Sequence, residues 1–291
     1  MGVINKIKKI LRKGHFIVYK IIKNVFYEMF IEDFLNRYHN NIKIVSSFET
    51  LNKIEDLIIR NERGVYLRFG DGDIFLLKNI ADSYQIVNKE LSIEMEEAFS
   101  LQGSNVVKCL AIHSEMFGFD KGMFSGNHLN TDRLSKLLLK NTMQYFIGNK
   151  IYSPVALHFV SSVNAERANH FLKILKLKTK IFIGNENVPK DKVQLLFGDS
   201  IHIKTPKINS YNEIDRIFLE SKNAINNLNE FSVICVAMGC SGRPLIKRIS
   251  YENKNVFLFD FGSLLDGLIG LESRTWLKVA DIDYETLIKG L

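Results

Sequence analysis

Hydrophobic and polar positions alternate between two kinds of segment from residue 48 onward. Short apolar runs rich in Val, Ile and Phe predict strands, and amphipathic stretches of helical length separate them. The predicted strands are 65–69, 106–112, 155–160, 180–183, 193–197, 232–238 and 256–261. The predicted helices are 49–61, 89–101, 130–146, 162–176, 211–228 and 242–252. A repeated strand-then-helix order predicts an α/β fold, with a mostly parallel sheet covered by helices on both faces.

The N-terminal residues follow a different pattern. Between residues 4 and 30 apolar side chains recur at three- and four-residue steps, which indicates a helical stripe, and lysines fill the opposite face. This stretch holds seven Lys and Arg residues against Glu28, so it carries +6 of the formal net charge of +7. We find no internal repeat and no Gly/Ser/Pro linker. The sequence therefore predicts a basic amphipathic helical extension over 1–45 and one α/β domain over 46–291.

Three interpretations of the extension stay open. A basic face opposite an Ile and Phe face binds anionic membrane surfaces, packs on a neighbouring domain with its lysines solvated, or contacts nucleic acid. The last has the least support, because no basic and aromatic stacking platform accompanies it.

No uncharged apolar run approaches the length of about 18 residues that a membrane span needs. The three cysteines show no metal-ligand spacing, which favours a reducing compartment. We expect a cytoplasmic protein, which under the membrane-surface interpretation is peripheral on the inner face of the membrane.

The loop after the first predicted strand is the strongest candidate for a functional site. It reads Arg68-Phe69-Gly70-Asp71-Gly72-Asp73 and leads into a helical run. The glycines Gly70 and Gly72 allow a tight turn and close backbone approach. Asp71 and Asp73 are spaced to hold a hard divalent cation, Mn²⁺ or Mg²⁺, that also bridges a diphosphate. Arg68 adds a charge for phosphate. The alternative is an ordinary turn and helix cap.

Further candidates follow later strands. The loop Met238-Gly239-Cys240-Ser241-Gly242-Arg243 precedes a helix, and glycines, a capping Ser241 and the helix N-terminus together predict an anion site. Glu186 follows a predicted strand, Asp260 lies at the end of another, and both are candidates for a general base. The alternatives are a plain strand-to-helix turn, a solvated loop glutamate and a hydrogen-bonded turn aspartate.

These segments resemble a known family. The first loop is similar to the Arg-Phe-Gly-Asp-Gly-Glu signature of the bacterial GT-D glycosyltransferases, with Asp73 in place of Glu. Residues 205–211 resemble the family's Pro-x-x-Asn-Ala-Phe segment, 236–245 its strand, loop and helix, and 260–262 its closing Asp-x-Gly. The resemblance covers about residues 48–285. It departs at 153–156, where an expected Ser-Arg-x-Tyr pattern is missing, and around Cys240 and Arg243.

The resemblance implies a Rossmann-like fold and a metal-dependent transferase, a hexosyltransferase in polysaccharide biosynthesis. It implies a nucleotide-sugar donor, specifically a UDP-sugar, and a glycan or lipid-linked acceptor. Thr205, Asn209 and Tyr211 would then contact uracil or ribose, although Asn209 is equally an N-cap. The rival functions are a nucleotidyltransferase or phosphotransferase on the same fold, and a non-catalytic nucleotide-binding protein associated with membranes.

The extension supplies a prediction. Flotation with vesicles containing anionic lipid should carry the full chain upward and leave behind a variant that lacks residues 1–30, because the basic amphipathic stretch is removed. Vesicles of neutral lipid are the control. Equal flotation of both proteins would rule out the membrane-surface interpretation.

Overall fold

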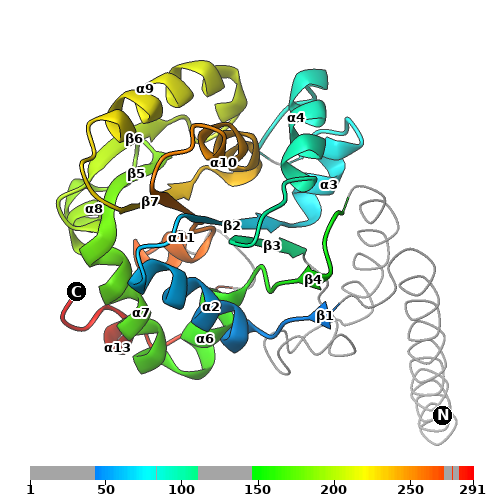
Figure 1. Ribbon diagram of the computed structural model, residues 1–291. Coiled ribbons are helices and arrows are strands. Elements are labelled where there is room, and N and C mark those ends of the chain that lie inside the picture. The colour runs from blue at the N-terminus through cyan, green and yellow to red at the C-terminus, as the bar shows by residue number, and fades with distance from the viewer. Residues whose placement is uncertain (1–42, 83, 111–145, 272–276, 278–281) are drawn as a thin grey trace, which may run out of the picture.

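The computed structural model describes residues 43–82, 84–110, 146–271, 277 and 282–291 (Figure 1). Residues 1–42 lie outside this part, so the interpretation of the N-terminal extension stays a prediction. The predicted helix 130–146 also falls almost wholly outside it. No helix within the described residues is long and apolar enough to cross a membrane.

A six-stranded parallel sheet forms the centre of the described chain. Its strand order is β3-β2-β8-β7-β5-β6. The strands are β2 (Gly64–Phe69), β3 (Val106–Leu110), β5 (Thr179–Asn185), β6 (Ile201–Thr205), β7 (Ser232–Ala237) and β8 (Val256–Asp260). A second, two-stranded parallel sheet joins β1 (Lys43–Ile44) to β4 (Lys150–Ile151). The predicted mostly parallel α/β fold is confirmed.

Helices cover both faces of the central sheet. On one face lie α3 (Asp71–Leu77), α4 (Lys89–Phe99), α9 (Ile214–Asn226) and α10 (Gly242–Ser250). On the other lie α2 (Ser47–Ile59), α6 (Ala156–Val163), α7 (Ala165–Lys178), α8 (Lys190–Phe197), α11 (Leu264–Leu268) and α13 (Tyr284–Ile288). Two short 3₁₀ helices, η2 (Ser210–Glu213) and η3 (Gly239–Ser241), precede α9 and α10.

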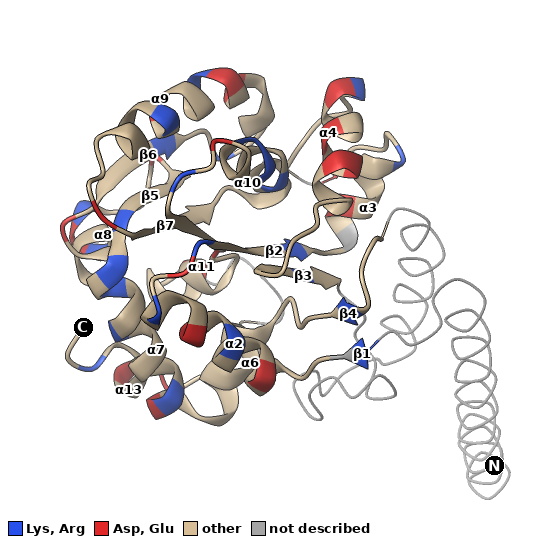
Figure 2. Cartoon of the chain, viewed as in Figure 1, with Lys and Arg blue, Asp and Glu red and all other residues tan. Residues whose placement is uncertain are grey.

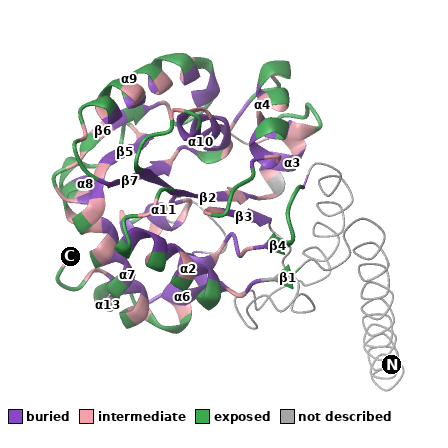
Figure 3. Ribbon diagram, viewed as in Figure 1, coloured by how far each residue is buried: buried purple, intermediate pink, exposed green. Residues whose placement is uncertain are grey.

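Strands of the central sheet such as β7 contribute side chains to both hydrophobic cores, because successive side chains point to opposite faces. In β7, Ile234 and Val236 pack under the α3–α10 layer, whereas Val233 and Cys235 pack under the α2–α13 layer. Both cores are buried between sheet and helices (Figure 3). Charged residues lie mostly on the surrounding helices and loops (Figure 2). Burial on both faces explains why these strands read as continuous apolar runs in the sequence.

Two predicted strands are helices in the structure. The run 155–160 lies in α6, where six consecutive residues are buried, so no helical period is visible in it. The run 193–197 belongs to α8, whose buried Val193, Leu196 and Phe197 follow the three- and four-residue steps of a helix. Short apolar runs do not separate a buried strand from a buried helix. Strand β6 was not predicted, because Ile201 is exposed and polar residues alternate along it.

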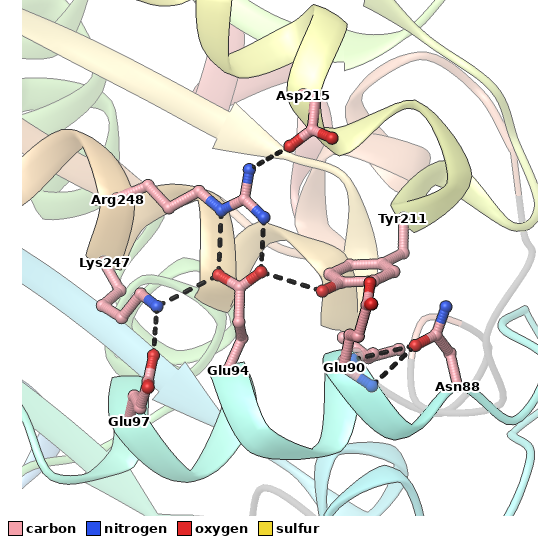
Figure 4. A network of polar contacts seen from close by, with 9 residues as sticks. Asn88, Glu90, Glu94, Glu97, Tyr211, Asp215, Lys247 and Arg248 are labelled. Atoms are coloured by element: carbon pink, nitrogen blue, oxygen red, sulfur yellow. Dashed lines mark hydrogen bonds and ion pairs between the residues drawn. The ribbon is translucent and has the colours of Figure 1, made fainter.

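A network of ion pairs ties three elements of one face together (Figure 4). Glu94 of α4 lies at its centre. Its carboxylate accepts hydrogen bonds from Arg248 Nε at 2.9 Å and Lys247 Nζ at 3.0 Å, both on α10, and from the Tyr211 hydroxyl at 2.8 Å. Arg248 also donates to Asp215 of α9 at 2.5 Å. Burial alone would raise the pKa of Glu94, but these hydrogen bonds outweigh it and lower the pKa to about 2.

Replacing Glu94 by Gln should lower the free energy of unfolding by about 2–3 kcal/mol at neutral pH, because charge-assisted hydrogen bonds are lost. The folded-state pKa lies below the ordinary value of 4.5, so the stabilisation is present above that pH. It disappears as the pH falls from 4.5 toward 2.

Urea unfolding of Glu94→Gln and of the wild type over this pH range should therefore converge toward acid. The exposed Glu96 on the same helix provides the control, since Glu96→Gln should change stability by less than about 0.5 kcal/mol. A Glu94→Gln effect as small as that, or one independent of pH, would contradict the role assigned to the network.

Candidate functional site

A cleft of about 670 Å³ opens at the carboxyl ends of the parallel strands. Residues that follow β2, β5, β6, β7 and β8 line it, together with Asp82, Tyr84 and Gln85 from the loop between α3 and α4. Open parallel sheets bind ligands at this edge. The predicted residues that line it are Arg68, Gly70, Gly72, Asp73, Thr205, Gly239, Ser241, Arg243 and Asp260. The fold therefore brings together segments that are almost 200 residues apart in the sequence.

The loop between β2 and α3 is folded tightly around Asp73. The Gly70 N–H donates to Asp73 Oδ2 at 2.6 Å, and the Asp73 side chain is buried. Gly72 has no room for a side chain, because a Cβ would lie 2.8 Å from Asp82 Oδ2 and 3.2 Å from Cys240 Sγ. Neighbouring side chains therefore approach the Gly72 backbone closely, as the sequence led us to expect. Asp71 begins α3, and its side chain lies outside the described part of the structure.

Arg243 joins two buried carboxylates across the cleft floor. Its Nε lies 3.1 Å from Asp73 Oδ1, and its Nη1 lies 3.3 Å from Asp260 Oδ2. Nη1 also donates to the Gly239 carbonyl at 2.5 Å. Burial raises the pKa of Asp73 to about 6, against the opposing effect of Arg243. Burial would lower the pKa of Arg243, but Asp260 and Asp73 raise it above its ordinary value, so the guanidinium keeps its charge.

Arg68 is the penultimate residue of β2, and its guanidinium lies beside the end of the neighbouring strand β8. Its Nη1 donates to the Phe261 carbonyl at 3.1 Å. Its buried Nε has no hydrogen-bond acceptor among the described residues. Gly262 has a φ of +70°, and a Cβ there would overlap the Arg68 guanidinium. A glycine at this position therefore serves both the backbone conformation and the placement of Arg68.

The loop between β7 and α10 is held by the segment around Gln85. Cys240 Sγ donates to Asp82 Oδ2 at 3.3 Å, and the Ser241 hydroxyl donates to Gln85 Oε1 at 3.0 Å. The Tyr211 N–H donates to the same Gln85 oxygen at 3.2 Å. Ser241 thus makes no side-chain cap for α10, contrary to the sequence interpretation. Gly239 has a φ of +60°, which glycine adopts at no steric cost.

Several cleft residues escaped the sequence interpretation. Asp82 Oδ1 accepts hydrogen bonds from the N–H groups of Tyr84 and Gln85, two and three residues further along the chain. Asp commonly forms local turns of this kind, so the residue type was a usable signal. Gln85 follows no motif or period. His158 falls in the run 155–160, which was predicted as a strand, but it lies on α6 and lines the cleft. Burial, with the charge of Arg68 in addition, lowers its pKa well below the ordinary value, so His158 is neutral.

Other predicted residues lie outside the cleft lining. Glu186 is exposed in the turn after β5, where its N–H donates to the Thr205 carbonyl. Asn209 has a left-handed backbone conformation. Its Oδ1 accepts a hydrogen bond from the Ile86 N–H at 3.0 Å, which ties it to the loop between α3 and α4. Gly242 is buried at the start of α10, packed against Met238 and Val236. The catalytic and binding roles of all these residues stay predictions.

The described residues do not fit a preformed metal centre. No group of three or more His, Cys, Asp and Glu side chains among them could hold a metal ion. Asp73 Oδ2 accepts the Gly70 N–H, and its Oδ1 is ion-paired with Arg243 without a hydrogen bond, as is Asp260. A cation at Asp73 would meet a fixed positive charge about 3 Å from that carboxylate.

No protein-family model and no curated protein matches the chain. Solved structures of domain of unknown function 1792 (DUF1792) share its fold. One, a selenomethionine-substituted structure, has a TM-score of 0.60 and 17% identity and covers 79% of this chain and 81% of its own. A second, described as a new glycosyltransferase from Streptococcus sanguinis, has a TM-score of 0.59 and 17% identity over 76% and 81% of the two chains. A third, described as having a distinct glycosyltransferase fold, has a TM-score of 0.55 and 18% identity over 76% and 78%. The chain therefore has the fold of these DUF1792 proteins.

The ion pairs of Arg243 give a prediction about stability. Arg243→Gln should lower the free energy of unfolding by about 3–5 kcal/mol, because it leaves two buried carboxylates without an opposite charge. Arg216 is the matched control, since it pairs with Glu213 and Glu220 on the exposed face of α9. Arg216→Gln should cost less than about 1 kcal/mol. Equal losses in urea unfolding would show that Arg243 is not the partner of buried charge.

Proposed function

We propose that this protein is a glycosyltransferase that takes a sugar from a nucleotide-sugar donor. The observation that carries the proposal is the pair of arginines, Arg68 and Arg243, at the carboxyl ends of parallel strands. They lie in a cleft whose volume falls in the range of small-molecule sites, about 300–1,000 Å³. Likeness in fold to a structure described as a glycosyltransferase supports the same reading.

The remaining polar groups of the cleft suit the nucleoside or sugar of such a donor. Gln85 Nε2 and Thr205 Oγ1 are buried and have no hydrogen-bond partner among the described residues. Both residues line the cleft. Buried polar groups in proteins almost always have partners. A ligand carbonyl or hydroxyl in the cleft would satisfy both groups, in agreement with the expected contact of Thr205 with base or ribose.

In the proposed reaction an acceptor hydroxyl oxygen attacks the anomeric carbon of the sugar. The bond from that carbon to the diphosphate breaks, and its electron pair leaves with the diphosphate. Arg68 and Arg243 stabilise the negative charge that grows there, and they are pre-positioned by Phe261, Asp73 and Asp260. Fixed donors of this kind need no rearrangement during the reaction.

The acceptor proton needs a base, for which the sequence offers two carboxylates. Asp260 lines the cleft, but its carboxylate is paired with Arg243. Glu186 is exposed and lies outside the lining. Both assignments stay predictions, as do UDP as the nucleotide and a glycan or lipid-linked acceptor.

Calorimetry with UDP-, GDP-, CMP- and dTDP-sugars tests the proposal, with each titration run in Mn²⁺, in Mg²⁺ and in chelator. At least one donor should bind and should slowly release its nucleotide by hydrolysis. Release of sugar 1-phosphate, or of a nucleoside monophosphate from a diphosphate-linked donor, would instead indicate a nucleotidyltransferase or phosphotransferase. Binding without turnover, with any acceptor offered, would indicate a non-catalytic protein. Failure of all four donors to bind would end the proposal.

Gly262→Ala tests the part of Arg68 without changing the arginine. The new Cβ would displace the guanidinium, so the affinity for the donor should fall by about tenfold. Gly290→Ala is the control, because Gly290 has a similar φ of +69° and only the flexible Lys173 side chain nearby. Both variants carry the same backbone penalty, so an equal change in affinity would show that Arg68 has no part in binding.

A further inference from the structure

The cluster of Arg243, Asp73 and Asp260 points to a specific way of holding the donor. We propose that the guanidinium groups of Arg243 and Arg68 bind the diphosphate directly and do the electrostatic work of a divalent cation, so that donor binding requires no metal. This inference rests on the proposed function and concerns the same cleft.

Arg243 occupies the position beside Asp73 that a metal would need. Its Nε and Nη1 lie within 3.3 Å of Asp73 and Asp260, two of the described carboxylates that could otherwise bind a metal. A metal at Asp73 would compete with this buried pairing, and loss of a buried ion pair leaves a buried charge uncompensated. A fixed positive charge is therefore already present beside Asp73.

Both guanidinium groups keep hydrogen-bond donors for a ligand. Arg243 is ion-paired through Nε and Nη1, its Nη1 donates to the Gly239 carbonyl, and its Nε makes no hydrogen bond with a described residue, so Nη2 is the donor assigned to phosphate. The side chain keeps 11% exposure and lines the cleft. Arg68 uses Nη1 on Phe261, which leaves its Nε–Nη2 edge, and this edge of a guanidinium binds two phosphate oxygens at once.

Both arginines reach the same strand end. Arg243 Nη1 contacts Asp260, the last residue of β8, and Arg68 Nη1 contacts the next residue, Phe261. Two guanidinium groups at one strand end can serve the two phosphates of a nucleoside diphosphate. Asp82, a further carboxylate of the cleft lining, is turned toward Tyr84, Gln85 and Cys240.

The test is a titration of the full chain, freed of metal, with the nucleoside diphosphate of the donor identified by screening. Kd in EDTA and Kd in excess Mn²⁺ should agree within about threefold, a difference of less than 1 kcal/mol. A larger loss of affinity in EDTA overturns this inference and leaves the glycosyltransferase proposal standing. Absence of binding under both conditions overturns the proposed function itself.

A conservative variant gives an independent reading. Arg243→Lys keeps the charge but loses the planar fork, so Kd in EDTA should rise by about tenfold or more. Arg216→Lys on the exposed face of α9 should leave Kd unchanged. Melting temperatures establish that both variants are folded before titration. An unchanged Kd for folded Arg243→Lys overturns the direct contact.

Manganese binding adds a readout that does not depend on nucleotide. Paramagnetic resonance of free Mn²⁺ should detect no stoichiometric site in the wild type. A stoichiometric Mn²⁺ site that is lost in Asp73→Asn would overturn the inference.

Discussion

Burial of charge at the carboxyl end of the sheet is the constraint on which the site depends. Asp73 follows β2, Asp260 ends β8, and both are removed from water. A buried carboxylate is costly unless an opposite charge and hydrogen bonds compensate it. Arg243 compensates both from a third segment, and this requirement fixes the β7–α10 loop against the loop after β2. The geometry of the cleft floor is thus a consequence of electrostatics as well as of packing.

The surrounding structure keeps this arrangement rigid from outside. Glu94 ties α4 to α10, the helix that begins beside Arg243, and to Tyr211 of η2. Tyr211 in turn reaches Gln85 through its backbone N–H, and Ser241 meets the same amide. The network of Figure 4 therefore continues into the cleft wall, and elements distant in sequence are held as one frame. Donors held by such a frame lose little freedom when an anion binds.

The sequence predicted the fold where local pattern and tertiary environment agree. Strands β2, β5, β7 and β8 are buried on both faces, so their apolar runs are unmistakable. Apolar runs also led to the wrong prediction of strands at α6 and α8, because a short buried helix shows a similar run of apolar residues. In the site, Gly70, Gly72 and Asp73 were identifiable from a loop between strand and helix. The pairing of Asp73 with Arg243 was not, since it depends on how strands 170 residues apart are ordered in the sheet. Gln85 left no signal, because its role comes from partners in other segments.

The central claim is that two guanidinium groups at the end of β8 form the anion site of this protein. A crystal structure of the metal-free protein with a nucleoside diphosphate tests it most directly. We predict that the diphosphate oxygens lie within hydrogen-bond distance of Arg68 and Arg243, with Arg243 still paired to Asp73 and Asp260. A diphosphate bound away from both arginines would contradict the claim.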